Sequence, residues 1–319
     1  MSSLSLWPRR AQILAMLALA AAIFAAFTVA PAAAGTAQQS SWGEGCDDGV
    51  FTSLDALTAS STARGEVIRE PELAQAKTDV PANRRHGRQP GFRTTVPTWV
   101  HVVSDGAIGN VSDRAIRDQI RVLDMTFGGF EGGVATGFDF ELVGTTRTNN
   151  ATWHYAGLAG PSESEMKQAL HTGGPDTLNL YLTTAGPYLG WSYYPSITDD
   201  PTFAYLDGVV IDWESMLGTS ETYAGRYDQG ETATHEVGHW LNLAHTFEGH
   251  CSRLGDGVED TPSERTPTSG CPVGKDTCPS EGVDPIHNYM DYSYDTCYTE
   301  FTAGQAARMQ DAWAFWRAT

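Results

Sequence analysis

The stretch HEVGHWLNLAH, residues 235–245, places three imidazole side chains close together in the chain. His235 and His239 are four residues apart, so on a helix they lie one turn apart on the same face. Two imidazoles in that arrangement can both bind one metal ion at ~2.0–2.1 Å, the usual Zn–N distance. Glu236 would lie beside that ion and accept a proton from a bound water. The alternative for the pair alone is two exposed histidines on the polar face of an ordinary helix.

The third histidine, His245, favours the metal site. It follows His239 by six residues, which is too far for the same helical face, so the chain must leave the helix sharply for His245 to reach the same ion. Such a turn needs a residue that tolerates positive φ, and Asn242 is of a type that does. Three histidines also leave one zinc position open, as a catalytic rather than a structural site requires. The spacing therefore predicts a catalytic zinc site.

The elements that must position these histidines follow from hydrophobic patterns. Residues 112–129 carry apolar residues at helical spacing after Ser112, a candidate N-cap, and predict an amphipathic helix. The segments QGETATHEVGHW and TAGQAARMQDAWAFW predict the histidine-bearing helix and a last helix. Strand-like patterns occur in TTVPTWVHVVSD, FDFELVGTTRT, TLNLYLTT and DGVVID. We therefore expect one α+β domain in which a sheet backs the helix at 231–241, followed by a loop-rich, cysteine-bearing region.

The first ninety residues differ from the rest. The basic segment MSSLSLWPRR, an apolar run and the small residues PAAAG form the pattern of a secretory signal peptide, with uncleaved anchoring as the alternative. The following segment has few large apolar residues and ends in PANRRHGRQPGF, which predicts an exposed, cleavable linker. We expect a signal peptide at 1–34, a pro-segment and linker at 35–88, and a secreted catalytic domain at 89–319.

Charge and cysteine content restrict the partners of the mature protein. From residue 91 onward there are 12 Lys or Arg and 31 Asp or Glu, so the whole net charge of −19 lies there. Such a surface repels nucleic acid and anionic membranes, and we expect neither as a partner. Four of the five cysteines lie between residues 251 and 297, where two disulfides could form in three pairings in an oxidising compartment.

HEVGHWLNLAH resembles the zinc signature of the metzincin metallopeptidases, and its Trp240-Leu241 pair is most similar to the pappalysin family. HNYMDYSYDTC resembles the Met-turn of that family, which implies that Met290 lies beneath the zinc and that Tyr292 helps to hold the metal site and the reacting carbonyl. The specific motifs cover about the last hundred residues, and the strands from residue 96 match in outline. The implied fold is a metzincin-type domain: a mixed twisted β-sheet backed by an active-site helix, with a loop-rich, disulfide-bearing C-terminal subdomain.

The resemblance also implies the activity, a zinc endopeptidase that cleaves protein or peptide substrates with a zinc-bound water and Glu236 as general base. It places an acid in the pocket for the residue after the scissile bond, and Asp295 occupies that position; the alternative is a surface-loop aspartate. A buried carboxylate there would select Arg or Lys, in agreement with self-cleavage before Arg85 or Arg88. The segment LNLYL, residues 178–182, matches the edge strand that receives an extended substrate.

The pattern of the family implies two disulfides, Cys251–Cys278 and Cys271–Cys297. It makes Cys46 a candidate switch whose thiolate binds the zinc until the pro-segment is removed. No Arg directly precedes this cysteine, so a stray or intermolecular cysteine is the alternative.

Relatives in the family also carry structural calcium. Asp256, Asp260 and Thr261 are therefore candidate calcium ligands, against the alternative of a solvated acidic loop. Two other functions compete with the zinc endopeptidase. One is a secreted binding protein on an inactive metzincin scaffold, which would not need Glu236. The other is a zinc hydrolase of non-peptide substrates, which an open groove beside an edge strand disfavours.

Overall fold

The computed structural model describes residues 79–318. The predicted signal peptide, the pro-segment up to residue 78 and Cys46 lie outside these residues. The strands are β1 (Thr94–Ser104), β2 (Phe138–Asn149), β3 (Leu178–Thr183), β4 (Gly190–Ser192) and β5 (Val209–Asp212). The α-helices are α1 (Asp113–Phe127), α2 (Ala151–His154), α3 (Pro161–Leu170), α4 (Glu231–Trp240) and α5 (Ala303–Ala312). Short turns are the 3-10 helices η2 (Ala82–Arg84), η3 (Pro195–Asp199), η4 (Ala204–Leu206), η5 (Trp213–Ser215) and η6 (Asp295–Cys297), and the π-helical η7 (Trp313–Arg317).

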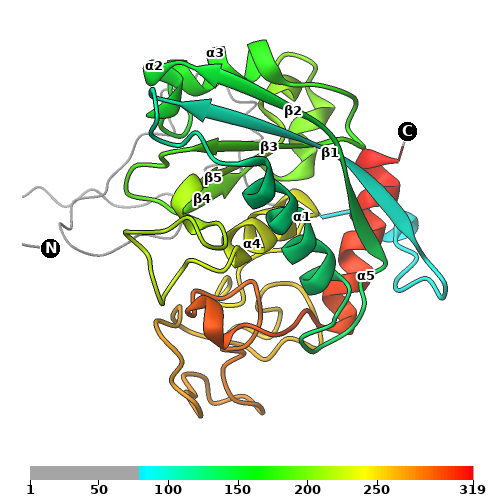
Figure 1. Cartoon of the computed structure of the whole chain (residues 1–319). Helices are drawn as coiled ribbons and strands as arrows, with labels where there is room; N and C mark the ends of the chain where they lie inside the picture. The colour runs from blue at the N-terminus through cyan, green and yellow to red at the C-terminus, as the bar shows by residue number, and fades with distance from the viewer. Residues whose placement is uncertain (1–78, 319) are drawn as a thin grey trace, which may run out of the picture. The chain divides into compact units, whose positions relative to one another are not determined.

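The five strands form one mixed sheet in the order β2-β1-β3-β5-β4 (Figure 1). Neighbouring strands run parallel except for β4, which is antiparallel to β5 at one edge. The strands that the sequence predicts are confirmed, but the prediction that residues 178–182 form an edge strand is wrong. That segment belongs to β3, which pairs with β1 on one side and β5 on the other. The edge strand nearest to β5 is β4 instead.

Both faces of the central strands are covered, because every residue of β3 is buried. Leu180 and Leu182 enter the large core shared with α1 and α4. Tyr181 and Val210 face the opposite side, where they pack with Met166 of α3. Successive residues of a strand point to opposite faces, so one run of apolar residues supplies two cores. The first core forms the floor on which α4 rests.

Helix α1 begins and packs as its sequence predicts. The Ser112 side chain accepts a hydrogen bond from the Ala115 backbone N–H, and Ile116, Ile120 and Leu123 are buried. Two polar side chains of α1 then fix the start of α4. The Gln119 amide donates to the Gly230 carbonyl at 3.0 Å. The hydroxyls of Thr126 and Thr234 lie 2.9 Å apart. These contacts hold the start of α4 against α1.

The far end of α4 is held by a buried arginine. Arg317 is completely buried and forms an ion pair with Asp207, with Nη1 and Oδ2 2.9 Å apart. Its guanidinium lies 3.5 Å from the centroid of the Trp240 ring, and its Nε donates to the Trp240 carbonyl at 3.0 Å. The charge, the ring face and the last carbonyl of the helix are satisfied together.

Beyond α4 the chain has little regular structure before α5. In this loop-rich region Cys251 is bonded to Cys278 and Cys271 to Cys297, the pairing that the family resemblance implies. Figure 1 shows this region, in yellow to orange, next to α4. Within residues 79–318, no helix has both the length and the apolar character needed to cross a membrane.

Candidate active site

The three predicted histidines converge on one point. The Nε2 atom of His239 lies 3.1 Å from Nε2 of His235 and 3.2 Å from Nε2 of His245. His235 and His239 are buried, whereas His245 is half-buried and leaves one side of the cluster accessible. Four ligands at ~2.0–2.1 Å around a tetrahedral ion are separated from one another by about 3.3 Å. Both separations are close to that value, and the ligand atoms of all three histidines lie within 4.8 Å of one another, so the cluster suits a tetrahedral zinc ion.

The outer ring nitrogens of the two helical histidines are bound to backbone carbonyls. His235 Nδ1 lies 2.6 Å from the Tyr289 oxygen, and His239 Nδ1 lies 2.7 Å from the Leu243 oxygen. A carbonyl can only accept, so each Nδ1 carries the proton and each Nε2 presents its lone pair to the metal position. The backbone thus sets the tautomer that zinc requires.

The chain leaves α4 through the left-handed turn that the sequence predicts. Asn242 has φ 75°, and the Leu243 N–H donates to the Gly238 carbonyl at 2.9 Å, which closes the helix. The carbonyl of Asn242 accepts from Arg308 Nε at 2.7 Å. Three residues later His245 reaches the other two histidines. Its ring stacks on Phe247, with centroids 4.6 Å apart and planes inclined by 10°.

The Met-turn lies directly against α4. Met290 is buried, and a Cβ atom built on Gly238 would overlap its Sδ atom and lie 3.2 Å from its Cε atom. The Met290 carbonyl accepts from the Thr246 N–H at 3.1 Å, next to His245. The turn therefore touches both the helix and the segment that carry the histidines.

Tyr292 lies at the accessible side of the cluster. Its hydroxyl is 3.2 Å from His245 Nε2, and its ring is packed edge-on against the His245 ring with centroids 5.0 Å apart. The side chain is half-buried. A phenol in this place can donate a hydrogen bond to an oxygen that develops charge beside the histidines.

Glu236 is buried at the boundary between α4 and the edge strand β4. A Cβ atom on Gly190, the first residue of β4, would lie 3.1 Å from both Cγ and Oε1 of Glu236. Neither β4 nor this role of Gly190 is predicted by the sequence patterns. A glycine within a short apolar segment is a signal of close approach by another group. Here it allows β4 to pass next to the predicted general base.

Asp295 is buried, which is contrary to the alternative of a surface-loop aspartate. Its Oδ2 accepts from the Gln229 N–H at 2.9 Å, just before α4. Glu231, the first residue of α4, is hydrogen-bonded to Asp295, and burial together with Asp295 raises the pKa of Glu231 to about 9. The two buried carboxyl groups oppose each other's ionisation, which favours a proton held between Glu231 and Asp295. Glu231 is not predicted as a site residue from the sequence, because an acid in the first turn of a helix is common without any such role.

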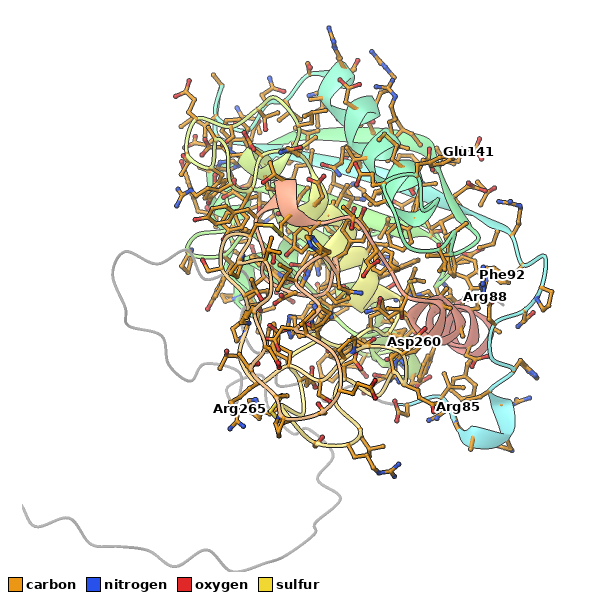
Figure 2. The ribbon with its side chains drawn as sticks, turned by 90° about the horizontal axis from the view of Figure 1, so that it is seen from below. Arg85, Arg88, Phe92, Glu141, Asp260 and Arg265 are labelled. Carbon is orange, nitrogen blue, oxygen red and sulfur yellow. A yellow bond between two sulfur atoms is a disulfide. The ribbon has the colours of Figure 1, made fainter. Side chains whose placement is uncertain are left out.

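The predicted calcium ligands have other visible contacts. Asp260 accepts the Thr302 hydroxyl at 2.7 Å and the Gly304 N–H at 2.9 Å, and so caps α5 (Figure 2). Asp256 Oδ1 accepts from the Val258 N–H at 2.9 Å, and Asp256 and Thr261 are both buried. The loop is thus not simply solvated.

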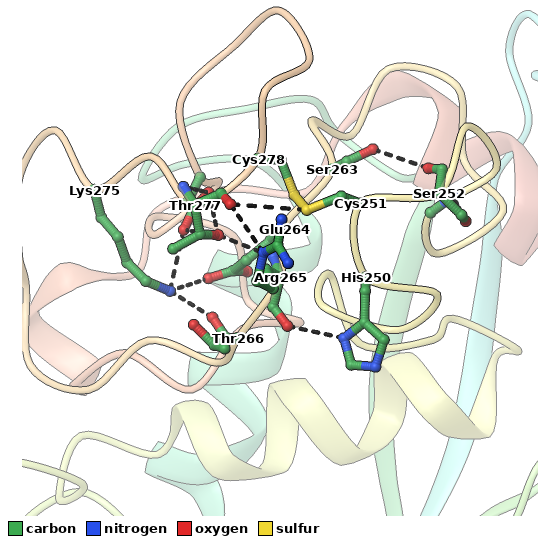
Figure 3. The surroundings of a disulfide bond; sticks show 12 residues. His250, Cys251, Ser252, Ser263, Glu264, Arg265, Thr266, Lys275, Thr277 and Cys278 are labelled. Atoms are coloured by element: carbon green, nitrogen blue, oxygen red, sulfur yellow. Dashed lines mark hydrogen bonds and ion pairs between the residues drawn. A yellow bond between two sulfur atoms is a disulfide. The ribbon is translucent and has the colours of Figure 1, made fainter.

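A polar network joins the first disulfide to the segment of His245. Figure 3 shows its part around Glu264, Lys275 and Thr277. Glu264 is buried; it accepts the Thr246 hydroxyl at 2.8 Å and is paired with Lys275, whose Nζ also lies 3.2 Å from Asp284. Burial and the nearby Asp291 raise the pKa of Glu264 to about 7, and Lys275 opposes that shift. These contacts anchor Thr246, the residue that follows His245, to the loop that carries the first disulfide.

A second cluster of potential metal ligands, Cys271, Cys297 and His287, is present in the described region. Both sulfurs of this cluster are bonded to each other, so it does not offer a metal site.

Comparisons with known proteins agree with this geometry. A family model described as pregnancy-associated plasma protein-A (Peptidase_M43) matches residues 210–314. An extracellular metalloprotease of Arthroderma gypseum is 45% identical over 226 residues, which are 69% of this chain and 73% of that protein. One of Arthroderma benhamiae is 40% identical over 280 residues, 84% of this chain and 90% of that protein.

Among solved structures, mature mirolysin of Tannerella forsythia with a cleaved peptide has a TM-score of 0.58 and 30% identity, and covers 69% of this chain and 92% of its own. A Tannerella forsythia promirolysin mutant has a TM-score of 0.60 and 29% identity, and covers 72% of this chain and 83% of its own.

Proposed function

Because this chain belongs to the pappalysin (M43) family of extracellular zinc metalloproteases, we propose that it is a secreted endopeptidase that prefers Arg or Lys just after the scissile bond. The carrying observation is the convergence of His235, His239 and His245 beside Glu236 and the edge strand of the described sheet. The three histidines would hold the zinc through Nε2.

The proposed chemistry divides between the metal and the side chains around it. Zinc, when bound, lowers the pKa of a water and polarises a carbonyl. Glu236 accepts the water proton at its carboxylate and returns it to the leaving amine. The same side chain thus acts first as base and then as acid. Tyr292 donates its hydroxyl hydrogen to the oxygen that becomes negative.

The substrate would lie along β4. This strand is antiparallel to β5, and no other strand of the described residues pairs with its outer side. An extended peptide added there forms backbone hydrogen bonds and passes close to Glu236. Mirolysin has been solved with a cleaved peptide, which supports a peptide as the substrate class.

The preference for a basic residue rests on Asp295. A substrate guanidinium or ammonium group that enters the pocket meets the buried Asp295 carboxylate. Because this carboxylate is shielded from water, water competes little for the ion pair. Glu231 makes the pocket unusual, since a second carboxyl group is hydrogen-bonded to the first. Binding of a cation would favour loss of the shared proton.

The same proposal includes processing of the N-terminal segment. We propose a signal peptide at 1–34, a pro-segment and linker at 35–88, and Cys46 as the thiol that holds the zymogen inactive. The existence of pro and mature forms of mirolysin supports a pro-segment. A structural calcium at Asp256 and Thr261 also remains a proposal, whereas Asp260 would need to bind it while capping α5.

The test is digestion of a denatured protein mixture by the processed enzyme, with mass spectrometry of the new termini. We expect cuts before Arg or Lys that disappear with a zinc chelator and with Glu236→Gln. Asp295→Asn should keep cutting but lose the basic preference. Chelator-sensitive cuts without that preference would refute the pocket and keep the mechanism. No cuts by folded, zinc-loaded protein would instead favour the binding scaffold.

A further inference from the structure

The described part of the predicted linker, residues 79–89, packs along α5. Val80 is buried with Ala312 and Trp316. Asp79 is ion-paired with Arg308 of α5 and lies 3.4 Å from Arg85. Figure 2 shows this segment beside α5, with Arg85 and Arg88 along it. The linker segment therefore has defined contacts with the catalytic domain.

Asp311 of α5 receives the linker backbone at one place. Its Oδ1 lies 2.7 Å from the His86 nitrogen, and its Oδ2 lies 3.3 Å from the Gly87 nitrogen. One residue earlier in α5, the Gln310 side chain accepts from the Gln89 N–H at 2.8 Å. Asp311 itself is only 6% exposed. A buried carboxylate thus faces the amide nitrogen of His86.

The residues just before His86 are a pair of arginines. Arg84 ends η2, and both Arg84 and Arg85 are exposed. Arg85 makes its contacts within its own segment, since its Nε donates to the Val80 carbonyl at 2.7 Å. An exposed pair of basic residues on one short turn is accessible to an endopeptidase that cuts after paired basic residues.

We propose that this chain is cleaved between Arg85 and His86, and that the new α-ammonium group of His86 forms an ion pair with Asp311. This rests on the proposed pro-segment and replaces self-cleavage before Arg85 or Arg88 as the final processing step. Hydrolysis breaks the C–N bond; the water oxygen joins the Arg85 carbonyl carbon, and the freed nitrogen is protonated. The existing amide hydrogen bond becomes a charge-assisted one.

Other cleavage positions would not use this arrangement. A cut before Arg88 removes both nitrogens that Asp311 binds. A cut before Arg85 places the ammonium group one residue away from the carboxylate. Only a terminus at His86 puts the new charge at 2.7 Å from Oδ1.

The other charges near Asp311 are few. A cavity of about 160 Å³ beside it is lined by charged side chains of Arg85, Glu259 and Arg308. Asp79 and Arg85 both leave with the cleaved peptide, whereas the Arg308 Nε keeps its hydrogen bond to the Asn242 carbonyl at 2.7 Å. The imidazole of His86 is exposed. The α-ammonium group would thus lie at hydrogen-bond distance from Oδ1 after cleavage, with the Arg308 guanidinium as the other described cation on this cavity.

The first measurement uses full-length protein with Glu236→Gln, so that its own activity does not contribute. The protein is treated with an endopeptidase specific for paired basic residues and, separately, with trypsin. N-terminal sequencing should find His86, and the double variant Arg84→Gln/Arg85→Gln should resist this cut. A stable product that starts at Arg85, Arg88 or a later residue would overturn the assigned site.

The second measurement tests the ion pair by thermal unfolding. At pH 7, Asp311→Asn should lower the Tm of the cleaved protein by about 2–4 °C more than it lowers that of the uncleaved double variant. An ion pair raises the pKa of the amine above its ordinary range of about 7.7–8.0. A raised folded-state pKa gives stability that is present below pH ~7.7 and is lost as the pH rises through the folded value, so the extra loss should vanish by about pH 10.

Equal effects of Asp311→Asn in cleaved and uncleaved protein at every pH would refute the ion pair. Neither experiment depends on peptidase activity, so both can fail while the proposed enzyme function stands. The converse also holds, because an inactive enzyme could still show the His86 terminus and its pH-dependent stability.

Discussion

Gly238→Ala tests whether the Met-turn packs directly against the histidine-bearing helix. Gly238 lies within α4, between Glu236 and His239, where no side chain separates the helix from Met290. A new methyl group would overlap the Met290 Sδ atom and meet Leu243 Cδ1 at an ordinary 3.6 Å. The contact with Met290 therefore decides the outcome.

Two opposing effects set the magnitude. Alanine gains about 1 kcal/mol over glycine in a helix interior. Overpacking of a buried contact costs about 1–3 kcal/mol. In Met290→Ala protein the clash is gone, so Gly238→Ala should stabilise it by about 1 kcal/mol. Met290→Ala alone should destabilise by about 2–5 kcal/mol, as removal of a buried methionine does.

The assay is urea unfolding of the four proteins of this double-mutant cycle, in a Glu236→Gln background that prevents autolysis. We expect a coupling energy of about 1–3 kcal/mol between the two positions. The same destabilisation by Gly238→Ala with methionine or alanine at 290 would refute the packing argument. In that case another neighbour of α4 would limit the helix at this position.

Three further outcomes follow from the site. Asn242→Gly should stabilise by about 1–2 kcal/mol in urea unfolding, because glycine adopts φ 75° readily and removes a buried amide that bonds to no described protein atom; Asn242→Ala keeps the backbone strain and should gain less. Because the pKa of Glu231 is raised from 4.5 to about 9, its protonated form stabilises the fold fully below pH 4.5, and this stabilisation is lost as the pH rises to about 9. The Tm should fall over this range, and Glu231→Gln should make the fall smaller. Glu236→Gln should lower kcat/KM at least about 10²–10⁴-fold, with zinc content by metal analysis unchanged.

Local patterns were sufficient for the parts of the site that lie close together in the chain. The spacing of His235 and His239, the turn residue Asn242 and the return to His245 are all encoded within eleven residues. The structure brings these three imidazoles together, with the positive φ at the predicted residue. Helix α1 was equally local, since its cap and its apolar stripe are both read from one segment.

The order of the strands depends on pairing between distant segments, and the predicted edge position of residues 178–182 is wrong. An apolar run such as residues 178–182 is compatible with an edge or a centre, and only its pairing with β1 and β5 places it in the centre. Helix α3 was missed for a related reason. Its segment contains Glu163 and Lys167, which suggest solvent, yet both are completely buried and paired at 3.0 Å. Trp191, from the distant β4, supplies the partner that makes this burial tolerable, at 2.7 Å from Glu163.

The two outer strands of the sheet have opposite consequences for association with other chains. β2 is a long edge strand, and its exposed positions include Asp139, Arg147 and Glu141. Figure 2 shows Glu141 at the surface. Charges along an exposed edge oppose pairing with another strand, which protects a sheet from aggregation. β4 is short and lies beside Glu236. The sheet would thus oppose a foreign strand at the charged β2 edge and leave the β4 edge, beside Glu236, as the one where an extended peptide meets less resistance.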